Sequence, residues 1–146
     1  ALAPVGAYIA VTGIFNVLPI LLAVAVLFWV AGFDIIYALQ DQDFDKANQL
    51  NSIPVMFGTN GALRISQIFH LISAISVIMV TYLLFQSFPQ VSWLTVLGLT
   101  TFLGLLIYQH LLVSPNDLSK VNLAFFTTNG IASLIFGSLV MLDLYL

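Results

Sequence analysis

The sequence contains no cysteine and very few charged residues. The absence of cysteine excludes disulfides and thiol-ligated metals within these 146 residues. Charged residues make up 6% of the chain, whereas a soluble domain typically carries about 25%. So few charges cannot cover a water-facing surface, and the hydrophobic content of 61% indicates that lipid is the main solvent of this protein.

Long uncharged runs divide the chain into membrane-spanning segments. A spanning helix needs about 20 apolar residues. Three uncharged runs, 65–90, 91–113 and 121–142, fit one pass each, and we expect spans over 62–87, 91–113 and 121–144. The run 1–33 is too long for one span, because at about 1.5 Å per residue it would exceed a hydrocarbon core of about 30 Å. Flexible Gly13 and polar Asn16 predict a break in it, which leaves a full span over 17–40.

The start of the chain provides only half a span. We expect a partial helix over 1–12 and interpret the chain as the carboxyl-terminal part of a longer protein whose amino-terminal helices are missing. A re-entrant or interfacial helix is the alternative, and a secretory signal does not fit because the start carries no positive charge. The predicted fold class is therefore all-α: a multi-pass transmembrane helix bundle with about four full spans and a partial first helix, forming a single membrane domain over 1–146.

The three cations indicate how the protein is oriented. Lys46 and Arg64 lie in or beside the predicted loop 41–63, and Lys120 lies in the connection 114–120. Two spans separate these connections, so both are expected on the same side of the membrane. Because positive charges favour the cytoplasmic side, we expect both connections in the cytoplasm.

Four of the six acidic residues lie in or just after the last part of the first full span: Asp34, Asp41, Asp43 and Asp45. Intervals of seven and four residues predict that Asp34, Asp41 and Asp45 share one helix face, while Asp43 points elsewhere. Ionised carboxylates at membrane depth cost at least about 2.5 kcal/mol each, so a cation between them is expected. Carboxylate oxygens favour Mg²⁺ or Ca²⁺, and an aspartate pair beside an apolar groove suits a lipid diphosphate bridged by Mg²⁺.

Two other interpretations of the acidic residues compete with a magnesium-diphosphate site. Asp41, Asp43 and Asp45 match the first three ligands of an EF-hand loop, but Lys46 and Ser52 stand where that loop needs Gly and Glu. The EF-hand is therefore rejected. The other interpretation is a solvated helix end, and the spacing alone does not decide between it and a metal site.

A longer pattern resembles a known family. The segment GFDIIYALQDQDFD (32–45), followed by SIPVMFG (52–58), resembles the second aspartate-rich region of the UbiA superfamily of intramembrane prenyltransferases. APVGAYIAVTG (3–13) and NLAFFTTNG (122–130) are similar to helices of the branch that prenylates 4-hydroxybenzoate and related quinone precursors. The resemblance covers nearly the whole chain, although the first aspartate-rich motif is absent from it.

The resemblance implies a nine-helix bundle in the bacterial inner (plasma) membrane, with a cavity open to lipid and Mg²⁺ as cofactor. Asp41 and Asp45 match metal ligands of the second motif. Asp34 and Tyr37 match positions that face the cavity near the aromatic acceptor. The loop 41–63 matches one that caps the site from the cytoplasm.

Four further residues carry chemistry that the sequence leaves open. Lys46 and Arg64 have the charge to bind diphosphate oxygens, although ordinary anchoring at the cytoplasmic face is the favoured explanation for both. His70 lies within a predicted span and His110 near the end of another. We expect His70 to be a neutral, hydrogen-bonded histidine between helices, and His110 to reach toward the interface.

The resulting functional hypothesis is transfer of a polyprenyl group from a prenyl diphosphate to a small aromatic acceptor such as 4-hydroxybenzoate, in quinone biosynthesis. A menaquinone-pathway acceptor is the alternative within the family, and the fragment alone is expected to be inactive. A cation- or proton-coupled transporter and a scaffold without chemistry are the competing classes. Lipid surrounds the protein, and no nucleic-acid partner is expected.

Overall fold

The computed structural model describes residues 1–126 and 128–146 and shows an all-α protein. Within this part of the chain, four helices are long and apolar enough to cross a membrane. They occupy Val17–Ala47, Ile53–Ser87, Trp93–Leu112 and Leu123–Tyr145. A shorter apolar helix, Ala3–Thr12, precedes them. The predicted bundle of four full spans and a partial first helix is confirmed.

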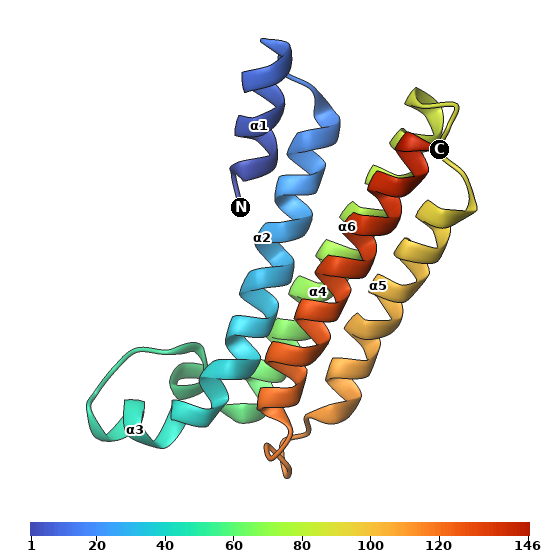
Figure 1. The fold of residues 1–146 in the computed structure, drawn as a ribbon. Helices are drawn as coiled ribbons and strands as arrows, with labels where there is room; N and C mark the ends of the chain where they lie inside the picture. The colour runs from blue at the N-terminus through green and yellow to red at the C-terminus, as the bar shows by residue number, and fades with distance from the viewer.

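The individual elements are labelled in Figure 1. In chain order they are α1 (Ala3–Thr12), α2 (Val17–Ala38), the 3-10 turn η1 (Leu39–Asp41), α3 (Gln42–Ala47), α4 (Ile53–Ser87), α5 (Trp93–Leu112), the π-helical segment η2 (Leu123–Thr128) and α6 (Asn129–Tyr145).

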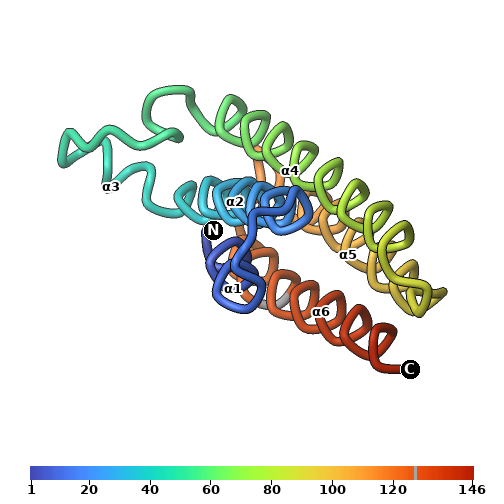
Figure 2. Tube along the Cα trace, turned by 90° about the horizontal axis from the view of Figure 1, so that it is seen from above, coloured from blue at the N-terminus to red at the C-terminus, as the bar shows by residue number. Residues whose placement is uncertain are grey.

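The helices pack as two pairs, α2 with α4 and α5 with α6. The connection from α2 to α4 and the connection from α5 to α6 lie at the same end of the bundle (Figure 1), as the count of spans predicted. At that end α3 and its following turn project sideways from the bundle, in the side view of Figure 1 and in the end view of Figure 2. Helix α3, which carries Asp43 and Asp45, and the turn after it therefore extend farthest from the axes of the long helices.

The break between α1 and α2 has the predicted cause. Gly13 adopts a left-handed conformation, with φ of 71°, and its N–H donates to the carbonyl of Ile9 at the end of α1. Asn16 then begins α2 by accepting a hydrogen bond from the N–H of Leu18 at 3.0 Å. Glycine favours this backbone conformation and asparagine is a strong N-cap, so these two residues separate the helices.

Polar side chains of α4 hold it against the backbone of α2. The Ser66 hydroxyl donates to the carbonyl of Gly32 at 2.6 Å, and the Ser73 hydroxyl donates to the carbonyl of Ala25 at 2.9 Å. Ser66 and Ser73 are seven residues apart and so lie on one face of α4. Small residues let two membrane helices approach closely, and hydrogen bonds between helices then add to the packing.

A buried carboxylate joins the second pair of helices. Asp143 of α6 accepts hydrogen bonds from the N–H and hydroxyl of Ser92, at 2.7 and 2.5 Å, and from those of Thr95, at 2.9 and 2.6 Å. The first N–H groups of a helix have no partner within the helix. Asp143 therefore caps α5 from the last turns of α6.

The loop predicted over 41–63 contains more helix than expected. Helical structure begins at Ile53, and the first turn of a helix tolerates Pro54, which has no N–H. Gly58, with φ of 68°, interrupts the helical backbone between two helical segments of α4. Residues 114–117 form a turn, because Ser114 and Asp117 exchange two backbone hydrogen bonds of 3.1 Å.

Candidate active site

Asp34 lies on the side of α2 that faces the start of α4. It lines a cavity of about 290 Å³ together with Ala31 and Ala38 of its own helix. The opposite wall consists of Ile53, Pro54 and Phe69 of α4. The carboxylate is therefore a solvent-accessible polar group on a mainly apolar cavity, which is an arrangement that suits orientation of an amphipathic molecule.

Tyr37 faces a different neighbour. Its ring lies 4.4 Å from that of Phe125 and 6.1 Å from that of Phe126, measured between ring centroids. Phe33, one turn earlier on α2, also packs edge-on against Phe125 at 5.2 Å. Tyr37 thus belongs to an aromatic wall shared by α2 and η2, and it does not line the cavity of Asp34.

Asp41 and Asp45 lie beyond the end of α2. We predicted that they share a helix face with Asp34, and this is wrong because α2 ends at Ala38 and the 3-10 turn η1 follows. Asp41 is the exposed last residue of η1, and Asp45 is half-buried in the first turn of α3. Carboxylates are favourable at a helix start, so this local structure tolerates both charges without a bound cation.

Gln42 fixes α3 to the start of α4. Its amide nitrogen donates to the carbonyl of Pro54 at 2.9 Å, and its amide oxygen accepts from the hydroxyl of Thr59, also at 2.9 Å. Thr59 directly follows the kink at Gly58. Sequence reasoning missed Gln42, and no local signal marks it, because its partners lie 12 and 17 residues farther along the chain.

The segment predicted as a capping loop is largely helical. Between α3 and α4 only residues 48–52 lie outside a helix. Lys46 is exposed in the last turn of α3, and Arg64 is exposed on α4. The structure thus places one cation on each side of this connection, and the capping role of the connection stays a prediction.

Asp41 and Asp45 can supply only part of the ligands that a magnesium ion needs. Among residues 1–126 and 128–146, no group of three or more His, Cys, Asp or Glu side chains is close enough to hold a metal. Mg²⁺ usually takes one or two protein carboxylates and completes its shell with water and substrate phosphates. Exposed Asp41 at the end of η1 and half-buried Asp45 on α3 fit that pattern when further ligands come from outside this set.

The fold and the site together define a multi-pass helical membrane protein that presents carboxylates at one end of its bundle. Comparison with protein families matches residues 1–131 to the UbiA prenyltransferase family. The chain therefore belongs to the UbiA prenyltransferase family. Neither the curated proteins nor the solved structures gave a match.

Family membership confirms the resemblance at the level of the family. It supports transfer of a prenyl group to an aromatic or similar acceptor, with a prenyl diphosphate as the donor, by an integral membrane protein. It also favours the enzyme over the transporter and the scaffold. The match includes Asp34, Tyr37, Asp41 and Asp45 but assigns no role to any of them.

Proposed function

We propose that the chain is the carboxyl-terminal part of a Mg²⁺-dependent enzyme that transfers a polyprenyl group to 4-hydroxybenzoate or a closely similar acceptor in quinone biosynthesis. The observation that carries this proposal is the family match over residues 1–131, combined with Asp41 at the end of η1 and Asp45 on the adjoining helix α3. A menaquinone precursor is the alternative acceptor. In this proposal the enzyme lies in the bacterial inner membrane, with α3 on the cytoplasmic side.

Asp41 and Asp45 would hold the magnesium ion. When bound, the ion neutralises charge on the diphosphate as it leaves. In this proposal the remaining ligands would come from the first aspartate-rich motif of the family, which lies outside these 146 residues. The proposal therefore includes the expectation that residues 1–146 alone are inactive.

The other side chains would bind, orient and shield the reactants. Lys46 and Arg64 donate hydrogen bonds to phosphate oxygens. Asp34 accepts a hydrogen bond from the hydroxyl of the aromatic acceptor, because its carboxylate opens on the cavity between α2 and α4. Tyr37 offers a π face that stabilises positive charge nearby.

The reaction breaks the allylic C–O bond, and the electron pair leaves with the diphosphate. A ring carbon of the acceptor attacks the allylic cation, and loss of a ring proton restores aromaticity. Water would compete for the cation, so the site must exclude it. In this proposal the connection 48–52 would shield the site, as the family resemblance implies for the loop 41–63.

The test compares Asp41 with Asp43, two exposed carboxylates two residues apart in the chain. In the full-length protein, Asp41→Asn should lower Mg²⁺-dependent transfer of a labelled prenyl group by at least about 100-fold, because loss of an electrostatic contact to the transition state costs about 3 kcal/mol. Asp43→Asn, an equal change at an exposed neighbour outside the predicted ligand set, should leave the rate within about twofold. Equal loss in both variants, or activity without Mg²⁺, would contradict the proposal. Parallel assays with 4-hydroxybenzoate and a menaquinone precursor identify the acceptor.

A further inference from the structure

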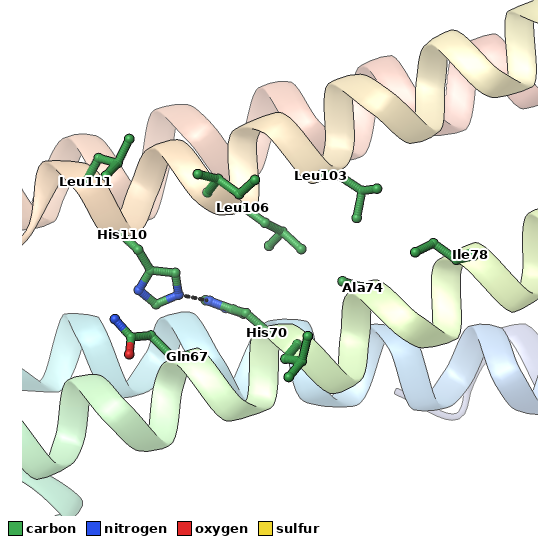
Figure 3. A pocket seen from close by; sticks show the side chains of 10 residues that line it. Gln67, His70, Ala74, Ile78, Leu103, Leu106, His110 and Leu111 are labelled. Carbon is green, nitrogen blue, oxygen red and sulfur yellow. Dashed lines mark hydrogen bonds between the residues drawn. The ribbon is translucent and has the colours of Figure 1, made fainter.

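A second cavity lies between α4 and α5, apart from the candidate active site. It has a volume of about 540 Å³, which is within the range of small-molecule pockets. Figure 3 shows that its wall is apolar over most of its length and that two histidines stand at one end. The apolar part is lined by Leu71, Ala74, Ile78, Leu103 and Leu106. The cavity shares no lining residue with the one beside Asp34.

His70 of α4 is held in place by two neighbouring helices, α2 and α5. It is buried, with an exposed fraction of 3%, and its Nε2 lies 3.2 Å from the carbonyl oxygen of Trp29 on α2. Gly32 of α2 leaves the space for this ring, because a Cβ at that position would overlap the imidazole. The amide nitrogen of buried Gln109 on α5 lies 3.0 Å from Nδ1 of His70. The expectation of a hydrogen-bonded histidine between helices agrees with this geometry.

These contacts determine which ring nitrogens carry protons. A backbone carbonyl only accepts, so Nε2 of His70 carries the proton and donates it to Trp29. Nδ1 of His70 then has one lone pair, which the amide nitrogen of Gln109 approaches at 3.0 Å and Nε2 of His110 approaches more closely. Nε2 of His110 lies 2.7 Å from that lone pair, and two lone pairs cannot face each other at this distance. Nε2 of His110 must therefore be the protonated nitrogen.

It follows that Nδ1 of a neutral His110 is an acceptor with a free lone pair. The part of the chain that the structure describes supplies no hydrogen-bond donor to this atom. His110 lines the cavity, and its ring is only partly buried. The polar end of the cavity thus offers Nδ1 of His110 as an acceptor, placed by a chain of hydrogen bonds that begins at the backbone of α2, beside the exposed amide of Gln67.

We propose that this cavity binds a long-chain amphiphile whose hydroxyl group donates a hydrogen bond to Nδ1 of His110. The apolar wall takes the hydrocarbon chain. A carboxylate or phosphate head would not fit, because an anion has no proton to donate and its charge would be desolvated against leucine side chains. Long-chain phenols and long-chain alcohols share the required chemistry, and both dissolve in the lipid around α4 and α5.

The test measures saturable binding of 4-dodecylphenol to the full-length protein in detergent micelles. Its methyl ether, 4-dodecylanisole, has the same chain and ring but no hydroxyl proton. One neutral hydrogen bond should make the phenol bind about five- to tenfold more tightly than the ether. His110→Phe should remove this preference and bind the two compounds equally. 1-Dodecanol in a parallel arm distinguishes the sources: competition by it identifies alcohols as ligands, and competition by phenols alone identifies an aromatic head.

Matched substitutions on two helices test the apolar wall. Leu103→Trp should fill the cavity and abolish binding of both probes, whereas Leu134→Trp, on the exposed surface of α6, should leave binding unchanged. If His110→Phe does not fold, ¹⁵N spectra of the histidine rings give the same information: Nδ1 of His110 should be unprotonated and should shift with the phenol but not with the ether. Equal binding of phenol and ether to the unaltered protein, or unchanged binding in Leu103→Trp, would overturn the proposal. None of these outcomes depends on Mg²⁺ or on Asp41, so failure of the proposed function is distinguishable.

Discussion

Aspartates occur at opposite ends of this bundle, in opposite environments. Asp143, near the end of α6, is 2% exposed and accepts four hydrogen bonds from Ser92 and Thr95. Asp41, at the projecting end of the bundle, is exposed to solvent. Three of the Asp143 bonds end on Oδ2 and one on Oδ1, and a buried carboxylate bonded in this way stabilises the fold and is not accessible to a ligand. An accessible one contributes little to the fold and keeps its oxygens for a cation or a substrate.

The largest effect that this comparison predicts concerns Asp45, the half-buried partner of Asp41 on α3. Asp45→Asn should lower prenyl transfer by at least about 100-fold, because a metal ligand is lost. The melting temperature in detergent should stay within about 2 °C of the unaltered protein, because surface substitutions usually change stability by less than about 0.5 kcal/mol. Parallel rate and melting measurements check this. A large fall in melting temperature with the rate preserved would assign Asp45 to the fold.

The opposite result is expected for Asp143. Asp143→Ala leaves the first turn of α5 without its cap and removes a contact between α5 and α6. The melting temperature should fall by roughly 10 °C, and the protein that remains folded should keep its activity. Asp43→Ala, at an exposed position on α3, is the control and should change the melting temperature by at most about 2 °C. Similar melting curves for the two variants would contradict the structural role of Asp143.

A smaller effect is expected where two helices pack closely. Gly32→Ala places a Cβ against the imidazole of His70, and overpacking of a tight site typically costs about 1–3 kcal/mol. Gly104 lies on α5, and a Cβ there meets no atom within 4 Å. Gly104→Ala should therefore be neutral or slightly stabilising, since alanine favours helices over glycine by about 1 kcal/mol. Unfolding in denaturant compares the two variants, and equal losses would show that the space beside His70 is not required.

The smallest effect concerns pH. The side-chain and backbone hydrogen bonds of Ser119, at 2.6 and 3.0 Å, lower the pKa of Asp117 below its ordinary value of 3.8. A lowered pKa means that these bonds contribute stability above the ordinary pKa and that the contribution is lost as the pH falls through the lowered value. Ser119→Ala should bring the pKa of Asp117 back toward 3.8, and an NMR titration of the Asp117 carboxyl carbon measures it. An unchanged titration would exclude the Ser119 hydroxyl as the cause of the lowered pKa.

Local features of the sequence predicted the fold well. The uncharged runs predicted the four spans, because a membrane helix needs about 20 apolar residues whatever it packs against. Gly13 and Asn16 predicted the break before α2, since a left-handed glycine and an N-cap act on their own backbone. Helix starts were less predictable. The segment 53–61 was expected in a loop, but it is helical except at Gly58, which interrupts α4.

The candidate site was only partly predictable, because its geometry depends on contacts between distant residues. The acidic pattern located the segment that carries Asp41 and Asp45, and the family match agrees with it. It did not show that η1 separates them from Asp34, because a 3-10 turn at Leu39–Asp41 has no distinctive signal. The bonds of His70 to Trp29 and His110 join residues about 40 positions apart, and only a folded chain brings them together.

The cap on α5 also has a consequence for biosynthesis. The ribosome completes Ser92 and Thr95 long before it reaches Asp143, which lies 51 and 48 residues later. While α5 enters the membrane, its first turn can therefore bond only to water or lipid head groups at the interface. The bundle acquires this contact only when α6 inserts, so a helix that is synthesised later completes the structure of an earlier one.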